Sequence, residues 1–373
     1  MRIRFFLLAA SLFLLAGPAQ AANVTVGCPG SPAGTYDFTS IQDALNAVDL
    51  VGPHTITVTG TCTEGVYIQD RRNVTIVSAG GYTATVVAPD YTDTVYIERS
   101  QNITLQSLVL TAVEPVWSGD VVVANYSQAA IRGCTITGTS TALWVFGHST
   151  AAINNTTIEN NSFGVYVQDT SRVTFTRRNR IANNADTGVY VIDLSEASFS
   201  SSRLADGTEL YTTIENHTVN GLLLARNSLA VFGGSVHHKI LNTGDPAFPD
   251  GAQGIFVTRN STLRANYLEI SGTYGSGLWV QSGSNAALTN SAISNNMQDG
   301  VTILLGASAE FLLANSVTGN GGASVSCDES SLVAVYDVLE GAHEVRCKNI
   351  MREVGPMRPG RIDPPGFEKK PQP

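Results

Sequence analysis

The sequence is poor in charge. Only 14% of its 373 residues are Asp, Glu, Lys or Arg, and the formal net charge is −9 at pH 7. Nucleic acids and anionic membranes attract clustered Lys and Arg, so we expect neither as a partner. Hydrophobic residues reach 43%, which is enough for a large core and too much for a disordered chain.

Long apolar runs are missing beyond the first 21 residues. Residues 1–21 have a basic start, an apolar stretch at residues 5–16 and an A-x-A site at residues 19–21, a pattern typical of a signal peptide. The apolar stretch is too short to span a bilayer and no later one is longer, so no membrane insertion is predicted. We therefore expect a secreted or periplasmic protein.

A four-residue pattern, here called the slot, recurs along the whole chain. GVYV at Gly164 returns as GVYV at Gly188, and most intervals between slots are 22–24 residues. Self-similarity at this period indicates a solenoid, a propeller or another array. The slots begin at Gly65, Thr94, Asp120, Ala142, Gly164, Gly188, Gly221, Gly254, Gly277, Gly300 and Gly322.

The slot alternates small, apolar, variable and apolar residues, which is the period of a strand with one buried face. Two more short apolar strands follow each slot, and no helical pattern separates them. A propeller blade would need a repeat of about 40–50 residues. The sequence therefore predicts an all-β fold, a parallel β-helix of about eleven coils over residues 22–350, followed by a disordered Pro-rich tail at residues 351–373.

The N-terminal mouth of such a solenoid has to be covered. In TSIQDALNAVDLVG, Ile41 and Leu45 lie at helical spacing after a potential N-cap, Thr39 or Ser40. This pattern predicts a capping α-helix at about residues 40–50.

Asn recurs at the end of the third strand of many coils. Asn tolerates left-handed backbone angles, and its amide can hydrogen-bond to the coils on either side. We expect a stacked ladder formed by Asn160, Asn183, Asn295 and Asn320.

FTSIQDALNAV, then HTITVTGTCTEGVYIQDRRNVTIVSAG, then the GVYV coils resemble right-handed parallel β-helix proteins of the pectate-lyase-like superfamily over residues 36–350. The resemblance implies a right-handed solenoid. The family includes polysaccharide lyases, polygalacturonases, pectin methylesterases, epimerases and exported members of unknown role. The sequence lacks the catalytic motifs of the polygalacturonases, lyases and methylesterases, so the resemblance supplies no catalytic residue.

Stacking places equivalent slot positions about 4.8 Å apart in columns. The second and fourth positions are mostly Val, Leu or Ile and face inward, so the third faces outward. Sugar rings stack on exposed aromatic rings, which makes this column a candidate polysaccharide-binding surface; alternatively, the rings only stabilise the sheet. The column is Tyr67, Tyr96, Val122, Trp144, Tyr166, Tyr190, Leu223, Phe256, Trp279, Thr302 and Ser324, with Trp144, Tyr166, Tyr190, Phe256 and Trp279 as the substrate-binding candidates.

A second column lies two residues beyond the slot and includes Asp169, Asp193, Arg226 and Arg259. Neighbouring carboxylates raise the pKa of one of them, and paired acids suit glycoside hydrolysis, so these four residues are our catalytic candidates. The two arginines could bind the carboxylate of an acidic sugar. The alternative is a surface salt-bridge ladder, in which each pair contributes about 0–1 kcal/mol.

Two insertions of about ten residues, near residues 200–213 and 239–253, could wall a cleft beside these columns. His237 and His238 have no carboxylate at ligand spacing, so we assign them a structural role and predict no metal site and no cofactor.

Five cysteines are present, so at least one is unpaired. From their spacing, Cys28 and Cys62 could tie the N-terminal segment to the first coil, and Cys327 and Cys347 could clamp the last one. We expect Cys134 to be a small buried thiol.

Two classes of function fit these patterns. The first is an exported, monomeric protein that binds or acts on a polysaccharide, acidic ones included, through an outer strand face. The second is a non-catalytic structural or adhesive surface protein. A binding site requires Tyr166, Tyr190 and Asp193 to be open in a groove, whereas a scaffold requires them to be covered or fully ion-paired. Whether the protein is an enzyme stays open at this point.

Overall fold

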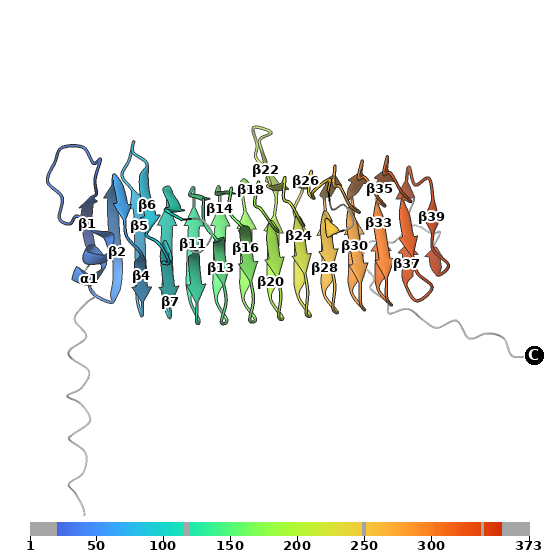
Figure 1. Cartoon of the computed structure of the whole chain (residues 1–373), viewed down its shortest axis with the longest axis horizontal. Helices are drawn as coiled ribbons and strands as arrows, with labels where there is room; N and C mark the ends of the chain where they lie inside the picture. Colours follow the sequence, from blue (N-terminus) through green and yellow to red (C-terminus); the bar gives the residue numbers. More distant parts are fainter. Residues whose placement is uncertain (1–20, 115–118, 248–250, 337–338, 353–373) are drawn as a thin grey trace, which may run out of the picture.

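The structure is a computed structural model, and it describes residues 21–114, 119–247, 251–336 and 339–352. These residues form an elongated stack of coils with three sheets running along its length (Figure 1). Each coil passes through sheet C, which contains the slots, then sheet A, then sheet B, and all pairings within these sheets are parallel. The predicted parallel β-helix is confirmed. The expected tail was placed two residues too early, because Met351 and Arg352 belong to the last strand, β40 (Ile350–Arg352), which pairs with its neighbour in sheet A. The rest of the tail and the expected signal peptide, apart from Ala21, lie outside the described residues.

Sheet C contains β4 (Val66–Gln69), β7 (Val95–Glu98), β10 (Val121–Ala124), β13 (Thr141–Val145), β16 (Phe163–Val167), β19 (Val189–Val191), β24 (Leu222–Leu224), β27 (Ile255–Val257), β30 (Leu278–Gln281), β33 (Val301–Leu304), β36 (Val325–Cys327) and β39 (Val345–Arg346). Sheet A contains β1 (Ala22–Gly27), β2 (Val51–Thr59), β5 (Arg72–Ser78), β8 (Gln101–Gln106), β11 (Gln128–Arg132), β14 (Thr150–Asn154), β17 (Arg172–Thr176), β20 (Glu196–Ser200), β25 (Leu229–Gly233), β28 (Thr262–Asn266), β31 (Asn285–Thr289), β34 (Ser308–Phe311), β37 (Leu332–Val335) and β40 (Ile350–Arg352). Sheet B contains β3 (Thr61–Thr63), β6 (Ala84–Ala88), β9 (Leu108–Ala112), β12 (Thr135–Thr137), β15 (Thr157–Glu159), β18 (Asn179–Ala182), β23 (Thr212–Glu215), β26 (His238–Leu241), β29 (Leu268–Ser271), β32 (Ala292–Ser294), β35 (Asn315–Thr318) and β38 (Leu339–Glu340).

The core lies inside the three sheets and is built from the inward positions that the alternation predicts. Val165 and Val167 of β16, for example, are fully buried. The glycine that opens most slots is explained by a close approach rather than by flexibility. A Cβ on Gly188 would lie 2.5 Å from Nε2 of His217 and 2.7 Å from the carbonyl oxygen of Gly221, so no larger side chain fits there unless its neighbours shift.

A buried serine ladder runs along the C–A corner, where each coil turns from sheet C into sheet A. The backbone N of Ser149 donates to Oγ of Ser171 at 3.0 Å, and the N of Ser171 donates to Oγ of Ser195 at 3.1 Å. These bonds satisfy backbone groups that the turn removes from the sheet. The ladder comprises Ser100, Ser127, Ser149, Ser171 and Ser195, and again Ser228, Ser261 and Ser284.

A second ladder lies at the B–C corner, and its register corrects the expected asparagine ladder. Asn160, Asn183 and Asn295 are exposed and adopt φ values of 59°, 52° and 55°. In each case the next residue makes the buried hydrogen bonds of the ladder. The residue in the left-handed turn points its side chain outward and cannot also reach the interior. The hydrogen-bonded members are Asn161, Asn184 and His217 in one run and Asn296 and Asn320 in another, so only Asn320 was predicted correctly.

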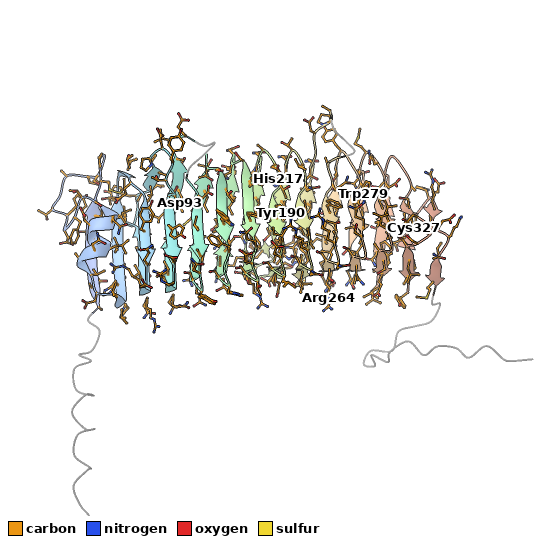
Figure 2. The ribbon with its side chains drawn as sticks, turned by 60° about the horizontal axis from the view of Figure 1, so that its bottom comes forward. Asp93, Tyr190, His217, Arg264, Trp279 and Cys327 are labelled. Atoms are coloured by element: carbon orange, nitrogen blue, oxygen red, sulfur yellow. A yellow bond between two sulfur atoms is a disulfide. The ribbon has the colours of Figure 1, made fainter. Side chains whose placement is uncertain are left out.

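Two histidines replace ladder residues in the interior. His217, labelled in Figure 2, accepts a hydrogen bond from the N of Asn184 through Nδ1. His238 accepts one from the N of Thr212 at 3.2 Å, in the same column as Cys134. Burial lowers the pKa of both histidines to about 4, so they are neutral at physiological pH. The structural role expected for His238 is confirmed.

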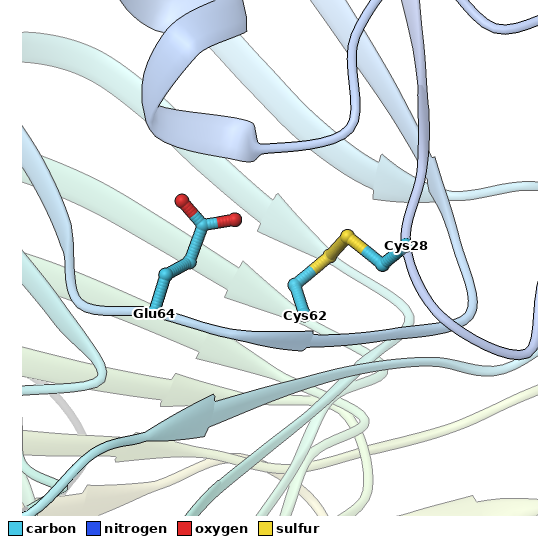
Figure 3. A group of neighbouring side chains, drawn as sticks. All are labelled: Cys28, Cys62 and Glu64. Atoms are coloured by element: carbon cyan, nitrogen blue, oxygen red, sulfur yellow. A yellow bond between two sulfur atoms is a disulfide. The ribbon is translucent and has the colours of Figure 1, made fainter.

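The N-terminal mouth is covered by α1 (Ile41–Ala47), which is shorter than predicted because Val48 is already extended. Ser40 is its N-cap. The carboxylate of Glu64 accepts hydrogen bonds from the backbone N of Ile41 at 2.8 Å and of Gln42 at 3.0 Å (Figure 3). A negative charge at a helix N-terminus satisfies otherwise unpaired N–H groups, so Glu64 fixes the cap onto the first coil.

The cysteine expectations are confirmed. Disulfides join Cys28 to Cys62 and Cys327 to Cys347, with Cα–Cα distances of 5.1 and 4.8 Å. The first lies beside the capping helix in Figure 3 and the second closes the last described coils. Cys134 is a buried free thiol, and burial raises its pKa to about 11. It is therefore not a reactive nucleophile.

The serine ladder predicts a specific stability loss. Replacing Ser171 with Ala would leave the buried N of Ser149 without its acceptor, so we expect a loss of about 1–3 kcal/mol in the free energy of unfolding. Urea denaturation followed by circular dichroism measures it. Ser198→Ala, on the outer face of β20, is the matched control and should change stability by less than about 0.5 kcal/mol. Equal losses in both variants would show that the ladder does not stabilise the stack.

Candidate functional site

The outer face of sheet C carries the predicted aromatic column. Trp144 pairs in register with Tyr166, Tyr166 with Tyr190, and Phe256 with Trp279. The last residue predicted for this column, Ser324, was wrong. Thr302 pairs with Ser326 rather than with Ser324, which is 5% exposed. The true last slot ends in Cys327 instead of Val, Ile or Leu, so the predicted slot lies two residues too early.

Beyond the pair Tyr67 and Tyr96, whose ring centroids lie 6.2 Å apart, the rings form two separate groups. Tyr190 of the first and Trp279 of the second are labelled in Figure 2. In the first, Trp144 and Tyr166 stack at 6.1 Å between ring centroids, and Tyr166 and Tyr190 at 5.0 Å. In the second, Phe256 and Trp279 meet edge to face at 6.4 Å. Leu223 lies between the two groups in the column.

The first group lines a pocket of about 220 Å³ together with Thr141 and Phe163. This volume is below the ~300–1,000 Å³ of typical drug-sized sites, so the pocket suits one ring rather than several. Tyr166 and Tyr190 are half-buried. Burial, with smaller contributions from neighbouring Tyr190 and Asp193, raises the pKa of Tyr166 and keeps its hydroxyl protonated.

Sequence reasoning missed Thr141 and Phe163. Both lie one residue before a slot, where strict alternation assigns them to the inner face. At the B–C corner the chain is still turning and the alternation does not hold. The signal that could have found them is the pair itself, a Thr and a Phe stacked in register directly before two slots.

The four catalytic candidates lie at the C–A corner, at the far end of the strands from Thr141 and Phe163. Their φ values of 55–58° explain the turn, because each occupies a left-handed position. Arg226 Nη1 lies 3.4 Å from Asp193 Oδ1, whereas Asp169 and Arg259 have no ion-pair partner among the described residues. None of the four lines the pocket, although the charges of Asp169, Asp193 and Arg226 act on Tyr166.

The salt-bridge alternative is partly realised in this column. Arg99 contacts Asp70 through two hydrogen bonds of 2.8 and 2.9 Å, and Arg226 faces Asp193. Of the residues that a binding site requires to be open, Tyr166 and Tyr190 line the pocket, while Asp193 is ion-paired. The structure therefore favours the aromatic column over the turn column as the site.

Two carboxylates at the B–C corner were also missed. Burial raises the pKa of Asp93, labelled in Figure 2, to about 6 and that of Asp120 to about 7. Oδ1 of Asp120 accepts a hydrogen bond of 2.6 Å from the backbone N of Thr141, which lines the pocket. Asp120 occupies a slot position that is Gly in most coils, and this departure was the available sequence signal.

The insertions do not wall the pocket as expected. The first forms the antiparallel hairpin of β21 (Ser202–Arg203) and β22 (Glu209–Leu210), which projects from the stack in Figure 1. It lies between β20 and β23, at the A–B corner opposite sheet C. The second precedes β27, on the B–C corner but beyond the coils that form the pocket.

The described residues hold one group with possible metal-ligand atoms, Cys28, Cys62 and Glu64. Its two sulfurs are joined in a disulfide and its carboxylate caps α1, so it does not fit a metal. Among the same residues, no helix has the length and apolar character needed to cross a membrane.

Comparison with known proteins establishes the family. The family model described as the right handed beta helix region matches residues 54–204, 91–243 and 176–337 in overlapping stretches. These cover more than half of the sequence, and the chain belongs to this family of right-handed parallel β-helix proteins. No curated protein matches it.

Solved structures resemble this chain at low sequence identity. A double mutant of the periplasmic alginate epimerase AlgG is 13% identical, with 84% of this chain and 83% of that chain covered and a TM-score of 0.53. Tailspike protein 2 from a bacteriophage of Escherichia coli O157:H7 is 13% identical, with 83% and 42% covered and a TM-score of 0.48. At 13% identity the likeness to AlgG shows the fold alone.

Asp120 predicts an unusual pH dependence of stability. Its pKa is raised in the folded protein, so its contribution is complete below about pH 4 and is lost as the pH rises through about 7. Asp120→Asn keeps an oxygen that can accept from Thr141 but carries no charge. At pH 8 this variant should be more stable than the wild type by roughly 1–2 kcal/mol, with a smaller gain at pH 4.

Urea denaturation at pH 4, 6 and 8 tests this dependence. Asp206→Asn is the control with the opposite pH dependence. Hydrogen bonds with Thr208 lower the pKa of Asp206, so loss of this carboxylate should cost more stability at high pH than at low pH. An identical gain for Asp120→Asn at pH 4 and pH 8 would contradict the assignment.

Proposed function

We propose that this protein is exported and binds a polysaccharide on the outer face of sheet C. The observation that carries the proposal is the pocket in which Trp144, Tyr166 and Tyr190 present a stacked aromatic surface. Aromatic rings offer a sugar an apolar surface in a fixed orientation. AlgG, which shares the fold, is an alginate epimerase, and this supports a glycan as ligand.

Phe256 and Trp279 extend the proposed polysaccharide-binding surface along the stack of coils. Phe256 lies two coils beyond Tyr190 in the same column, which corresponds to about 9–10 Å at the strand spacing. A glycan chain lying parallel to the axis of the β-helix would therefore reach both aromatic groups. The signal-peptide pattern and the two disulfides support export.

For any turnover of the glycan, Asp169, Asp193, Arg226 and Arg259 stay our catalytic candidates, because they end the same strands that carry the aromatic column. The Asp193–Arg226 ion pair favours the second function, a non-catalytic structural or adhesive surface protein, in which this column only joins neighbouring coils. Arg259 has no ion-pair partner among the described residues and keeps acidic glycans among the candidates.

A glycan array and polysaccharide pull-down with the mature chain test binding. The Tyr190→Ala/Trp279→Ala double variant removes one ring from each group, and we expect affinity to fall about tenfold or more, since each ring contributes on the order of 1 kcal/mol. Tyr126→Ala, an exposed aromatic outside the column, is the matched control and should bind as the wild type does. Binding by neither the wild type nor the variants would refute the proposal.

Turnover has a separate test. If the bound glycan is cleaved or modified, Asp193→Asn should slow the reaction by about 10²-fold or more while leaving affinity within a few-fold, as expected for loss of an acid or base. Asp70→Asn, at the equivalent position of another ion pair, should leave the rate unchanged. A fully active Asp193→Asn variant would remove this residue from any catalytic role.

A further inference from the structure

The charged groups nearest the pocket are mostly negative, and this limits the class of sugar that the pocket can hold. The five lining residues are all uncharged. Asp120 lies behind the wall of the pocket, hydrogen-bonded to the N of Thr141. From the other end of the strands, the charges of Asp193 and Asp169 act on the ionisation of Tyr166, and Arg226 acts against them. Carboxylates therefore flank the pocket at both ends.

The cations nearby do not balance these carboxylates. Arg226 faces Asp193, so these two charges offset each other and Asp169 is left without a paired cation. Arg259 is one coil further along, beyond the coil of Leu223, and does not line the pocket. A sugar carboxylate in the pocket would meet negative charge without a matched cation, and partial burial would strengthen that repulsion.

Two carboxylates of the protein near the pocket, Asp93 and Asp120, are also disfavoured in their charged form. Burial raises the pKa of Asp93 to about 6 and that of Asp120 to about 7, so this corner holds negative charge poorly. Neither has a cationic partner within ion-pair distance among the described residues.

The lining of the pocket also includes uncharged groups that can hydrogen-bond, the hydroxyls of Thr141, Tyr166 and Tyr190. A hydroxyl can both donate and accept a hydrogen bond. A hydroxyl or carbonyl oxygen of an uncharged sugar can pair with such groups, and it brings no net charge to be desolvated.

From these observations we infer that the sugar bound in the pocket that Trp144, Tyr166 and Tyr190 line is a hexose or hexosamine without a carboxylate, rather than a uronate. This inference rests on the proposed function, since it names the class of glycan for the same site. Any acidic sugar units bound by Arg226 and Arg259 would then lie outside the pocket.

Matched polymers test this directly. Polygalacturonate and alginate, both polyuronates, are compared with the same polymers after carboxyl reduction, which removes the charge and keeps the linkages. Binding of the mature chain is measured by titration calorimetry at pH 8, above the raised pKa values of Asp93 and Asp120. We expect at least tenfold tighter binding of a reduced polymer than of its native form, with the difference shrinking as salt is added.

A single variant should reverse the preference. Phe163→Arg places a cation at the rim of the pocket, where the half-buried phenylalanine now lies, and should bring the affinity for the native polyuronate to or above that for its reduced form. Phe163→Leu is the matched control and should keep the preference of the wild type. Circular dichroism checks that both variants are folded.

The outcomes separate the two proposals. Tighter binding of the native polyuronates, lost in Tyr190→Ala, would overturn the inference while supporting a polysaccharide site. A preference for reduced polymers that Tyr190→Ala leaves intact would also overturn it, because the discrimination would then arise outside the pocket. Absence of binding to native polymers, reduced polymers and a neutral glycan array would overturn the proposed function itself.

Discussion

The in-register stacking of coils is the constraint on which the rest of the structure depends. Each strand of sheets A, B and C hydrogen-bonds to the equivalent strands of the coils beside it, so a position within one coil becomes a column along the molecule. Any choice of residue is repeated about 4.8 Å away, and its effect is repeated with it. Repeated along the column, buried valines form a core, serines form a hydrogen-bonded ladder and tyrosines form a surface of stacked rings.

Stacking also explains why polar groups are tolerated inside. At each corner the chain leaves a sheet, and backbone N–H groups lose their sheet partners. Serine at the C–A corner and asparagine or histidine at the B–C corner accept these bonds from the preceding coil. Because each side chain serves the coil next to it, the ladders stabilise the contact between coils rather than a single turn.

Much of the fold could be predicted from the sequence, because strand alternation and the repeat are both local, periodic signals. The prediction failed where the period breaks. Asn160 and Asn183 were chosen one residue too early, since the sequence does not show where the left-handed turn ends and the buried ladder begins. The same limit hid Thr141 and Phe163, whose orientation is set at a corner. The aromatic column was predictable, whereas the pocket it forms with the corner residues was not.

The position of the pocket follows from how single coils depart from the repeat. Val122 on one side and Leu223 on the other end the run of Trp144, Tyr166 and Tyr190 with small aliphatic side chains. The three rings are already held by one another and by the strand register, so a ligand would restrict few additional rotamers on binding. A β-helix can therefore change its ligand by substituting one outward residue per coil, while the inward residues and ladders keep the fold. In this chain the departures place aromatic rings at the centre and carboxylates at both corners, and that combination is the basis of the proposed preference for an uncharged sugar.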